Sequence, residues 1–262
     1  MREQDLFEMK ARAGKPIAHC LVIDAHGHLG LGAQFPLVDT SLETTVTVMD
    51  RMGIDLLAVS SLQALFGDAQ RGNRTVQEAL QRFPGRFFGY MVVDVGYPDR
   101  ILPEMERCLQ AGFQGVKIHT AGRPEIPYSH NNYRPVFEFA NVHHLPVLAH
   151  TWGADLDHLE PLIGRYPNVH WLMAHAASQQ KEKYIRLARE YPSVYIETCL
   201  SACPRGLIEE LVSEGLADKV VWGSDMIFMG AAEQLGRVVF AQISPADKEK
   251  ILGLNARRAL RL

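Results

Sequence analysis

Two histidines separated by a single residue, His26 and His28, are the strongest chemical signal in the chain. They follow the apolar run that begins at Cys20, and such a run is typical of a buried strand. Side chains two positions apart on a strand point to the same side, so both imidazoles can face one point. Neutral imidazoles held in this way are suitable ligands for zinc or a similar metal. The pair alone is weak evidence, because two histidines in a surface loop would have the same spacing.

Three more polar residues end apolar runs in the same manner. His150 closes PVLAH, His175 closes VHWLMAH and Asp225 closes KVVWGSD. Each has an ordinary structural explanation by itself, as a hydrogen-bonded core histidine or, for the aspartate, as a helix N-cap. A buried carboxylate needs a partner, however, and a metal supplies one. Together with His26 and His28, these residues predict a metal site rather than a coincidence.

Eight short apolar runs provide the strands that must position these residues. They begin at Cys20, Ile54, Phe87, Gln114, Pro146, Val169, Ser193 and Lys219. The runs are too apolar for half-exposed strands and are typical of parallel strands buried on both faces. Segments with helical periodicity, such as 178–191, lie between them, and this alternation implies parallel pairing through helical crossovers.

We therefore expect an α/β fold, a single (β/α)₈ TIM barrel, over residues 20–262, preceded by an N-terminal arm or short helix over residues 1–19. The length of 262 residues suits one such barrel, which typically has about 250. The predicted histidines and the aspartate all lie at the carboxyl ends of the strands, where barrels of this kind carry their active sites. A doubly wound open sheet is the alternative, but no G-x-G-x-x-G follows the first run and no phosphate-binding loop is present.

Composition excludes several classes of partner. Hydrophobic residues make up 47% of the chain and charged residues 22%, as in an ordinary globular protein. A net charge of -3 without a lysine or arginine run argues against a nucleic-acid partner. No apolar stretch is long enough for a membrane span, and the polar N-terminus lacks a signal-peptide pattern, so we expect a cytoplasmic protein. The spacing of the cysteines favours reduced thiols over a zinc knuckle; they are Cys20, Cys108, Cys199 and Cys203.

The set His26-x-His28, His150, His175 and Asp225, in this order along the chain, resembles the amidohydrolase superfamily. The segments GVKIH, PVLAHTW, WLMAH, VYIET, VVWGSDM and ILGLNARRAL further resemble the branch that contains aminocarboxymuconate-semialdehyde decarboxylase and related lactonases, hydratases and hydrolases. The resemblance runs from about Val22 to the C-terminus. Its motifs are specific for the superfamily, moderately specific for the branch, and uninformative about the substrate.

The resemblance implies that His26, His28, His150 and Asp225 bind one divalent metal, most commonly zinc, with manganese as the other candidate. It implies that His175 contacts the metal-bound water or the substrate, so that Asp225 and His175 are the expected catalytic residues. One metal per chain is favoured over two, because the sites of this branch usually hold a single ion.

Lys117, at the end of the fourth run, leaves the number of metals open. In binuclear branches a lysine at this place is carboxylated and bridges two ions. His119 lies on the same face of the strand, so both side chains can contact a substrate carboxylate. Trp152 and Arg205 follow the fifth and seventh runs and are further candidates for substrate contacts, the arginine again to a carboxylate. The polar loop 120–132 adds three candidate contacts, Arg123, Tyr128 and His130.

The predicted function is a metal-dependent hydrolase, in which an activated water attacks an ester, lactone or amide of a small molecule. A decarboxylase or hydratase of an unsaturated or aromatic carboxylic acid is an alternative on the same residues. A barrel that binds metal or ligand without turnover is a second alternative, although the completeness of the ligand pattern counts against it. Association into a homo-oligomer is compatible with the sequence, which shows no stripe that would identify an interface.

Overall fold

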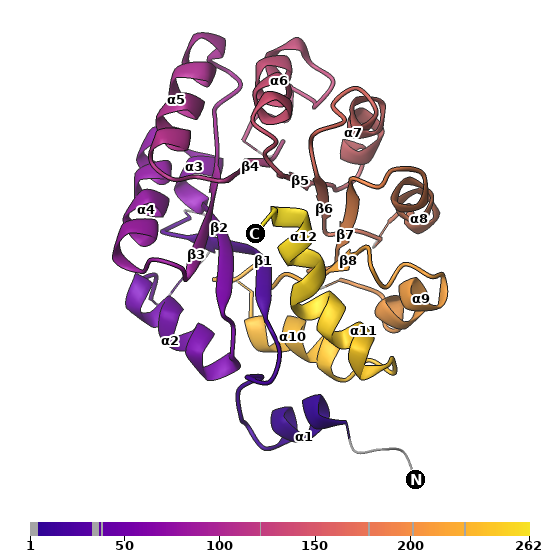
Figure 1. Cartoon of the computed structure of the whole chain (residues 1–262). Helices are drawn as coiled ribbons and strands as arrows, with labels where there is room; N and C mark the ends of the chain where they lie inside the picture. Colours follow the sequence, from indigo (N-terminus) through magenta and orange to yellow (C-terminus); the bar gives the residue numbers. More distant parts are fainter. Residues whose placement is uncertain are drawn as a thin grey trace.

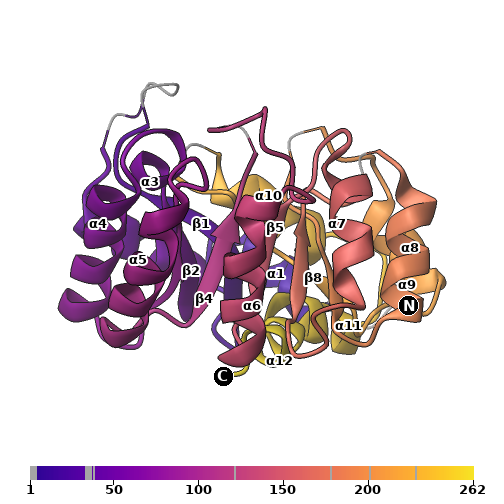
Figure 2. The same ribbon diagram turned by 90° about the horizontal axis from the view of Figure 1, so that it is seen from above.

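Eight parallel strands pair in chain order in the computed structural model, which describes residues 5–32, 37, 39–120, 122–177, 179–200, 202–227 and 229–262. The strands are β1 (Ile23–Leu29), β2 (Leu56–Ser61), β3 (Phe87–Met91), β4 (Gly115–Ile118), β5 (Val147–His150), β6 (Trp171–Ala174), β7 (Val194–Glu197) and β8 (Val220–Val221). Each overlaps one of the eight apolar runs, so the predicted barrel is confirmed. Figures 1 and 2 show helices alternating with these strands and surrounding them.

The helices occupy the segments between the strands, as the alternation predicts. They are α1 (Leu6–Arg12), α2 (Leu42–Met52), α3 (Leu62–Phe66), α4 (Ala69–Arg82), α5 (Pro98–Gln110), α6 (Arg134–Val142), α7 (Asp155–Ile163), α8 (Lys181–Glu190), α9 (Leu207–Ser213), α10 (Ala231–Val239), α11 (Pro245–Glu249) and α12 (Asn255–Leu260), with a short 3₁₀ helix η1 (Asn131–Tyr133) and a π-helical segment η2 (Lys250–Leu254). The helix expected over 178–191 is α8; Ser178 lies outside the described residues.

The segment before the barrel contains α1, so the predicted N-terminal helix is present. It packs against α10 and buries Phe7, which is 1% exposed. The buried ammonium of Lys248 contacts the carboxylate of Asp5 and donates to the carbonyl of Val239 at 2.6 Å. Residues 1–4 lie outside the described residues, and the boundary between arm and barrel at residue 19 stays a prediction.

Irregular backbone contacts between β1 and the segment after β8 join the two ends of the sheet. Ala25 N donates to the carbonyl of Trp222 at 3.2 Å, and Asp225 N donates to that of His26 at 2.7 Å. Gly223 permits this close approach, because a Cβ atom there would lie 2.6 Å from Cβ of His26. The same junction therefore brings Asp225 beside His26.

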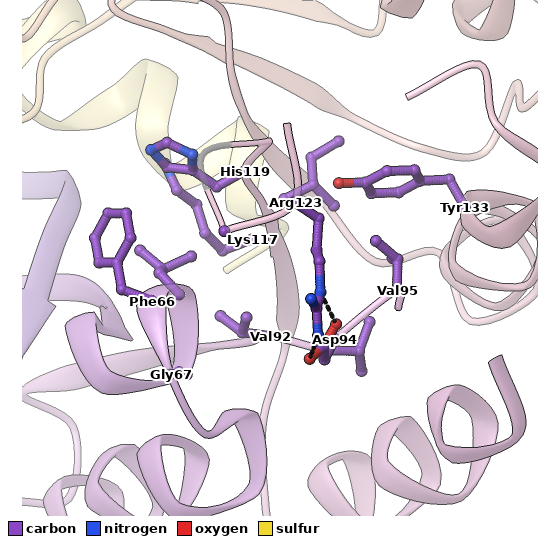
Figure 3. Close-up of a pocket in the computed structure, with 14 residues that line it drawn as sticks. Phe66, Gly67, Val92, Asp94, Val95, Lys117, His119, Arg123 and Tyr133 are labelled. Atoms are coloured by element: carbon purple, nitrogen blue, oxygen red, sulfur yellow. Dashed lines mark hydrogen bonds and ion pairs between the residues drawn. The ribbon is translucent and has the colours of Figure 1, made fainter. Parts of the chain in front are cut away.

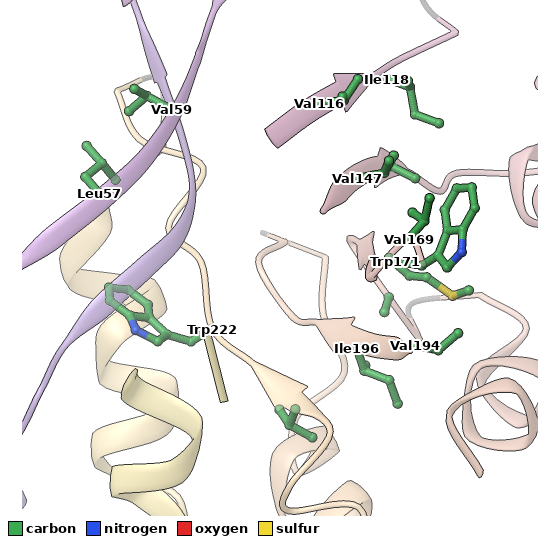
Figure 4. Packing of buried hydrophobic residues seen from close by; sticks show 14 of the residues in the cluster. Leu57, Val59, Val116, Ile118, Val147, Val169, Trp171, Val194, Ile196 and Trp222 are labelled. Atoms are coloured by element: carbon green, nitrogen blue, oxygen red, sulfur yellow. The ribbon is translucent and has the colours of Figure 1, made fainter. Parts of the chain in front are cut away.

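Apolar side chains fill both faces of the strands. Those inside the barrel include Ala58, Phe88, Tyr90, Leu148, Leu172 and Tyr195. Those packed in the larger cluster around it include Leu57, Val59, Val116, Val147, Trp171 and Ile196 (Figure 4). Because strand residues alternate between faces, Lys117, which lies between Val116 and Ile118, points towards the barrel axis.

No helix among the described residues is both long enough and apolar enough to cross a membrane. The four cysteines are free thiols, as their spacing predicts. Cys199 is buried directly after β7, where it contacts the histidines described next.

Candidate metal centre and its pocket

Three side chains predicted as metal ligands converge where β1 meets the segment after β8. His26, His28 and Asp225 are all buried, and their candidate ligand atoms lie within 4.8 Å of one another. Asp225 Oδ1 is 2.9 Å from Nε2 of His28 and 3.5 Å from Nε2 of His26. The geometry presents two imidazole nitrogens and one carboxylate oxygen to a common point.

The other nitrogen of each imidazole has its own partner. Nδ1 of His26 lies 2.9 Å from Oε2 of Glu197, and Nδ1 of His28 lies 3.1 Å from Oγ of Ser60. With the ring proton on Nδ1, each Nε2 carries a lone pair directed towards Asp225. Such contacts orient metal-binding histidines and select the tautomer that can bind an ion.

Burial keeps these groups in states suited to binding a cation. It lowers the pKa of His26 well below its ordinary value, with the charge of Lys117 adding to the effect, and it lowers the pKa of His28. Burial opposes ionisation of Asp225, but the contact with His28 outweighs it and lowers the pKa of the carboxyl. Neutral imidazoles and an ionised carboxylate are the forms that coordinate metals.

Lys117 and Glu197 stand on either side of His26. Nζ of Lys117 is 3.0 Å from Nε2 of His26, and burial lowers the pKa of this ammonium. Burial raises the pKa of Glu197 to about 8, although its Oε1 accepts a 2.6 Å hydrogen bond from the backbone of Cys199. Nζ of Lys117 therefore lies beside Nε2 of His26, and the carboxyl of Glu197 lies beside Nδ1 of the same ring.

His150, the fourth predicted ligand, lies beside this group without joining it at the 4.8 Å spacing. Its ring is 4.8 Å from that of His175 and stacks on His119 at 3.8 Å. Nδ1 of His150 is buried and has no hydrogen-bond partner among the described residues. His150 as a metal ligand therefore stays a prediction.

The ring of His175 lies 5.1 Å from that of His26. Its Nδ1 is 2.8 Å from the carbonyl oxygen of Cys199 and 4.0 Å from Oδ2 of Asp225. Both His175 and Asp225 have left-handed backbone conformations, with φ of 61° and 59°. This conformation is costly for residues other than glycine, and such strain gathers at functional sites.

The residues present fit a divalent cation. Asp225 Oδ1 makes no hydrogen bond among the described residues, although it lies 2.9 Å from Nε2 of His28. A divalent cation bound at these two atoms would give the carboxylate oxygen the partner that a buried charge needs. Nitrogen and carboxylate donors are typical of zinc sites and are also compatible with manganese.

A pocket of about 190 Å³ adjoins the centre through Lys117 and His119, which both line it (Figure 3). Phe66 forms one wall, where its ring meets that of His119 edge-on at 5.5 Å. Arg123 and Tyr133 line other parts of the pocket. Its volume is below the range of about 300–1,000 Å³ typical of sites for drug-sized ligands, so the space suits a smaller molecule.

The other predicted substrate contacts lie elsewhere. Trp152 is 43% exposed and Arg205 is exposed in the turn before α9; neither lines the pocket next to Lys117. Tyr128 is buried and donates to the carbonyl of His150 at 2.8 Å. His130 is exposed, and its Nδ1 accepts from the backbone of Asn132 at 3.2 Å. Substrate roles for Trp152 and Arg205 stay predictions.

Four residues of this region had no predicted role: Ser60, Tyr133, Glu197 and Cys199. Glu197 ends an apolar run exactly as the histidines do, and that position was the available signal. Tyr133 follows the predicted contact loop by one residue. Nothing in the spacing of Ser60 or Cys199 singles them out, since their contacts depend on how the strands face one another.

Together, the barrel and the buried histidine–aspartate group define a fold with a candidate metal centre at the carboxyl ends of its strands. A family model described as amidohydrolase matches residues 23–262. The chain belongs to this family, as the resemblance of its motifs implied. No curated protein matches the chain significantly.

Solved structures of similar fold include two decarboxylases and a hydratase. 2,6-Dihydroxybenzoate decarboxylase from Rhizobium is 18% identical, with a TM-score of 0.74 and coverage of 94% of this chain and 99% of that one. 5-Carboxyvanillate decarboxylase from Novosphingobium aromaticivorans, complexed with manganese, is 16% identical, with a TM-score of 0.73 and coverage of 95% and 99%. 4-Oxalomesaconate hydratase from Rhodopseudomonas palustris is 19% identical, with a TM-score of 0.70 and coverage of 92% and 96%. These likenesses show the shared fold.

Proposed function

We propose that this protein is a metal-dependent hydrolase that holds one divalent cation through His26, His28, His150 and Asp225 and acts on a small carboxylic acid derivative. The observation that carries the proposal is the convergence of buried ligand atoms from His26, His28 and Asp225, with no hydrogen bond at Oδ1 of Asp225 among the described residues. Zinc is the preferred ion, because its common donors are those present. Manganese is the other candidate, since it is present in the structure of 5-carboxyvanillate decarboxylase.

A divalent ion held here would supply Lewis acidity, lowering the pKa of water from 15.7 towards about 7 and polarising a substrate carbonyl. The chain itself provides the proton carriers. Asp225, whose pKa is lowered, is ionised at neutral pH and can accept a proton at a carboxylate oxygen. His175, whose pKa burial lowers, is neutral.

His175 is oriented for a second proton transfer. Its Nδ1 lies 2.8 Å from the carbonyl of Cys199 and donates to it, which leaves Nε2 as the basic atom. From that atom the ring can hold a proton and return it to a leaving group. Lys117 supplies positive charge beside the centre, where it can bind a substrate carboxylate.

Non-oxidative decarboxylation is a second candidate activity, favoured by one specific observation. Lys117 and His119 line a pocket that opens directly beside the candidate ligands, so a carboxylate bound there lies next to the proton carriers. The two decarboxylases of similar fold make this reaction worth testing alongside hydrolysis.

Elemental analysis of protein purified without chelator tests the proposal. We expect about one zinc or manganese per chain, its loss on dialysis against a chelator, and its absence from the Asp225→Asn variant. Assays of lactones and esters for acid release, and of aromatic acids for carbon dioxide release, then separate the two activities. Protein that binds no divalent metal even after reconstitution would refute the proposed function.

A further inference from the structure

The pocket beside Lys117 contains a polar group that no described residue satisfies. Tyr133 is only 2% exposed, yet its hydroxyl makes no hydrogen bond with the described residues. Figure 3 shows its ring on the side of the pocket opposite Phe66, with the hydroxyl directed into the pocket. A hydroxyl that faces a pocket and makes no hydrogen bond within the protein is available to a molecule bound there.

The ring of Tyr133 is fixed independently of its hydroxyl. It packs edge-on against Tyr128 at 5.2 Å and stacks with Phe137 at 5.8 Å. The oxygen is therefore held in place by apolar contacts of the ring, and only its hydrogen-bonding capacity remains open. That arrangement is more suited to a hydroxyl that binds a ligand than to one that stabilises the fold.

Arg123 lines the same pocket, and its charge is already neutralised. Its Nε and Nη2 donate to the two carboxylate oxygens of Asp94 at 3.1 and 3.0 Å. Gly96 makes room for this pair, because a Cβ atom there would lie 2.7 Å from Nε of Arg123. Asp94 also lines the pocket, so this part of its wall carries one fixed positive and one fixed negative charge.

The two parts of the pocket therefore differ in charge. Lys117 lies at the metal centre, where it provides an ammonium for an anion. A second carboxylate near Arg123 would meet the negative charge of Asp94, whereas an uncharged oxygen meets no such repulsion. The unpaired hydroxyl of Tyr133 is able to donate to, or accept from, an uncharged hydroxyl or carbonyl oxygen.

We propose that Tyr133 is a specificity-determining residue that binds an uncharged oxygen substituent of the substrate, so that the preferred substrate is a small carboxylic acid bearing a hydroxyl or carbonyl group away from the reacting carboxylate. This inference rests on the proposed function for the position of the reacting group. It narrows that function to one class of substrate and disfavours dicarboxylic acids.

Calorimetric titration of the zinc-loaded protein with benzoate, 3-hydroxybenzoate, 4-hydroxybenzoate and benzene-1,4-dicarboxylate tests this inference. We expect at least one hydroxybenzoate to bind about tenfold more tightly than both benzoate and the dicarboxylate, which corresponds to one good hydrogen bond. In Tyr133→Phe that preference should fall to about twofold or less, with binding of benzoate unchanged.

Tyr166→Phe is the matched control. Tyr166 packs on Phe137, the same ring that Tyr133 contacts, at 5.6 Å. It does not line the pocket, so its variant should keep the preference for hydroxybenzoates. The thermal midpoint of Tyr133→Phe should equal or exceed that of the wild type, because the removed hydroxyl has no partner among the described residues. A lower midpoint would show that the hydroxyl is structural and would overturn the inference.

Failure of the subsite and failure of the proposed function give different results. A preference for hydroxybenzoates that persists in Tyr133→Phe, tighter binding of the dicarboxylate, or no binding of any probe would overturn the subsite, whatever the metal content. If the preference depends on Tyr133 but the protein binds no divalent metal even after reconstitution, the subsite stands and the metal-dependent function fails.

Discussion

Two buried polar clusters of this barrel differ in how completely their polar atoms are hydrogen-bonded. Between α4, α5 and the end of β3, the side chain of Asn73 donates to the carbonyl of Val92 and to Glu104, each at 2.8 Å, and accepts from the Val92 N–H at 3.1 Å. Glu104 in turn binds Arg107 through both carboxylate oxygens at 2.7 and 2.9 Å. In and beside the candidate metal centre, by contrast, Asp225 Oδ1 and His150 Nδ1 make no hydrogen bonds among the described residues.

The pKa values of the two buried glutamates reflect this difference. Burial opposes ionisation of both, but hydrogen bonds from Arg107 and Asn73 outweigh it at Glu104 and lower its pKa. At Glu197 burial wins, and the pKa rises to about 8. A buried polar group that stabilises the fold is expected to have all its hydrogen-bond partners within the protein, whereas one that binds a ligand is expected to have an unused donor or acceptor.

The largest effect that tests this contrast is expected from Asp225→Asn. The variant removes the one charged ligand, so metal affinity should fall by more than about 100-fold, since loss of an outer contact alone costs about 10–100-fold. The metal-free variant should lose less stability than Asn73→Ala, because Oδ1 of Asp225 makes no hydrogen bond among the described residues. Metal titration and urea unfolding in chelator measure the two quantities.

A loss of stability in metal-free Asp225→Asn as large as that in Asn73→Ala would contradict the comparison, because it would mean that Asp225 is fully satisfied without an ion. His170→Asn serves as the control, since His170 bonds the carbonyl of Ala259 at 3.1 Å and lies outside the candidate centre. It should leave metal affinity unchanged.

Asn73→Ala should show the opposite pattern. It removes three hydrogen bonds and leaves the peptide groups of Val92 and one oxygen of Glu104 short of partners, so the free energy of unfolding should fall by about 3 kcal/mol. Metal content should stay at the wild-type level. A fall in metal content without a fall in stability would mean that the two clusters are coupled.

Glu197→Gln is expected to have a smaller effect than loss of a ligand. The amide keeps the shape of the side chain but replaces the carboxylate beside Nδ1 of His26, so metal affinity should fall by about 10–100-fold. Competition with a chromophoric chelator measures the change. Wild-type affinity in this variant would show that Glu197 does not orient the His26 ring.

Much of this picture follows from the sequence alone. Eight apolar runs gave the strands, and polar residues at their ends identified His26, His28 and Asp225 as neighbours, because parallel strands bring their carboxyl ends to one face. Trp152 and Arg205 are exposed instead of lining the described pocket, since a residue beyond a strand end follows a loop whose path no periodicity predicts.

The sequence did not predict the contacts that depend on which way side chains point across the barrel. The approach of Glu197 to His26 requires the closure of β8 on β1 and the absence of a side chain at Gly223, where a Cβ would lie 2.8 Å from Oε1 of Glu197. The unpaired hydroxyl of Tyr133 likewise depends on the aromatic packing that holds its ring. The spacing of residues along the chain predicts neither the contact of Glu197 with His26 nor the position of the Tyr133 hydroxyl.

The smallest effect is expected in the pH dependence of the free energy of unfolding, which tests whether Glu104 is stabilised in its ionised form. The pKa of Glu104 is lowered from its ordinary value of 4.5, so its stabilising contribution is fully present above that pH and is lost as the pH falls through the lowered value. Chelator-treated wild type should therefore lose stability in urea melts as the pH falls below about 4.5, and Glu104→Gln should show a shallower loss over the same range. Equal losses of stability with falling pH in the two proteins would mean that Asn73 and Arg107 do not favour the ionised form of Glu104. The cluster around Asn73 would then not differ from the candidate metal centre in how well its buried carboxylate is satisfied.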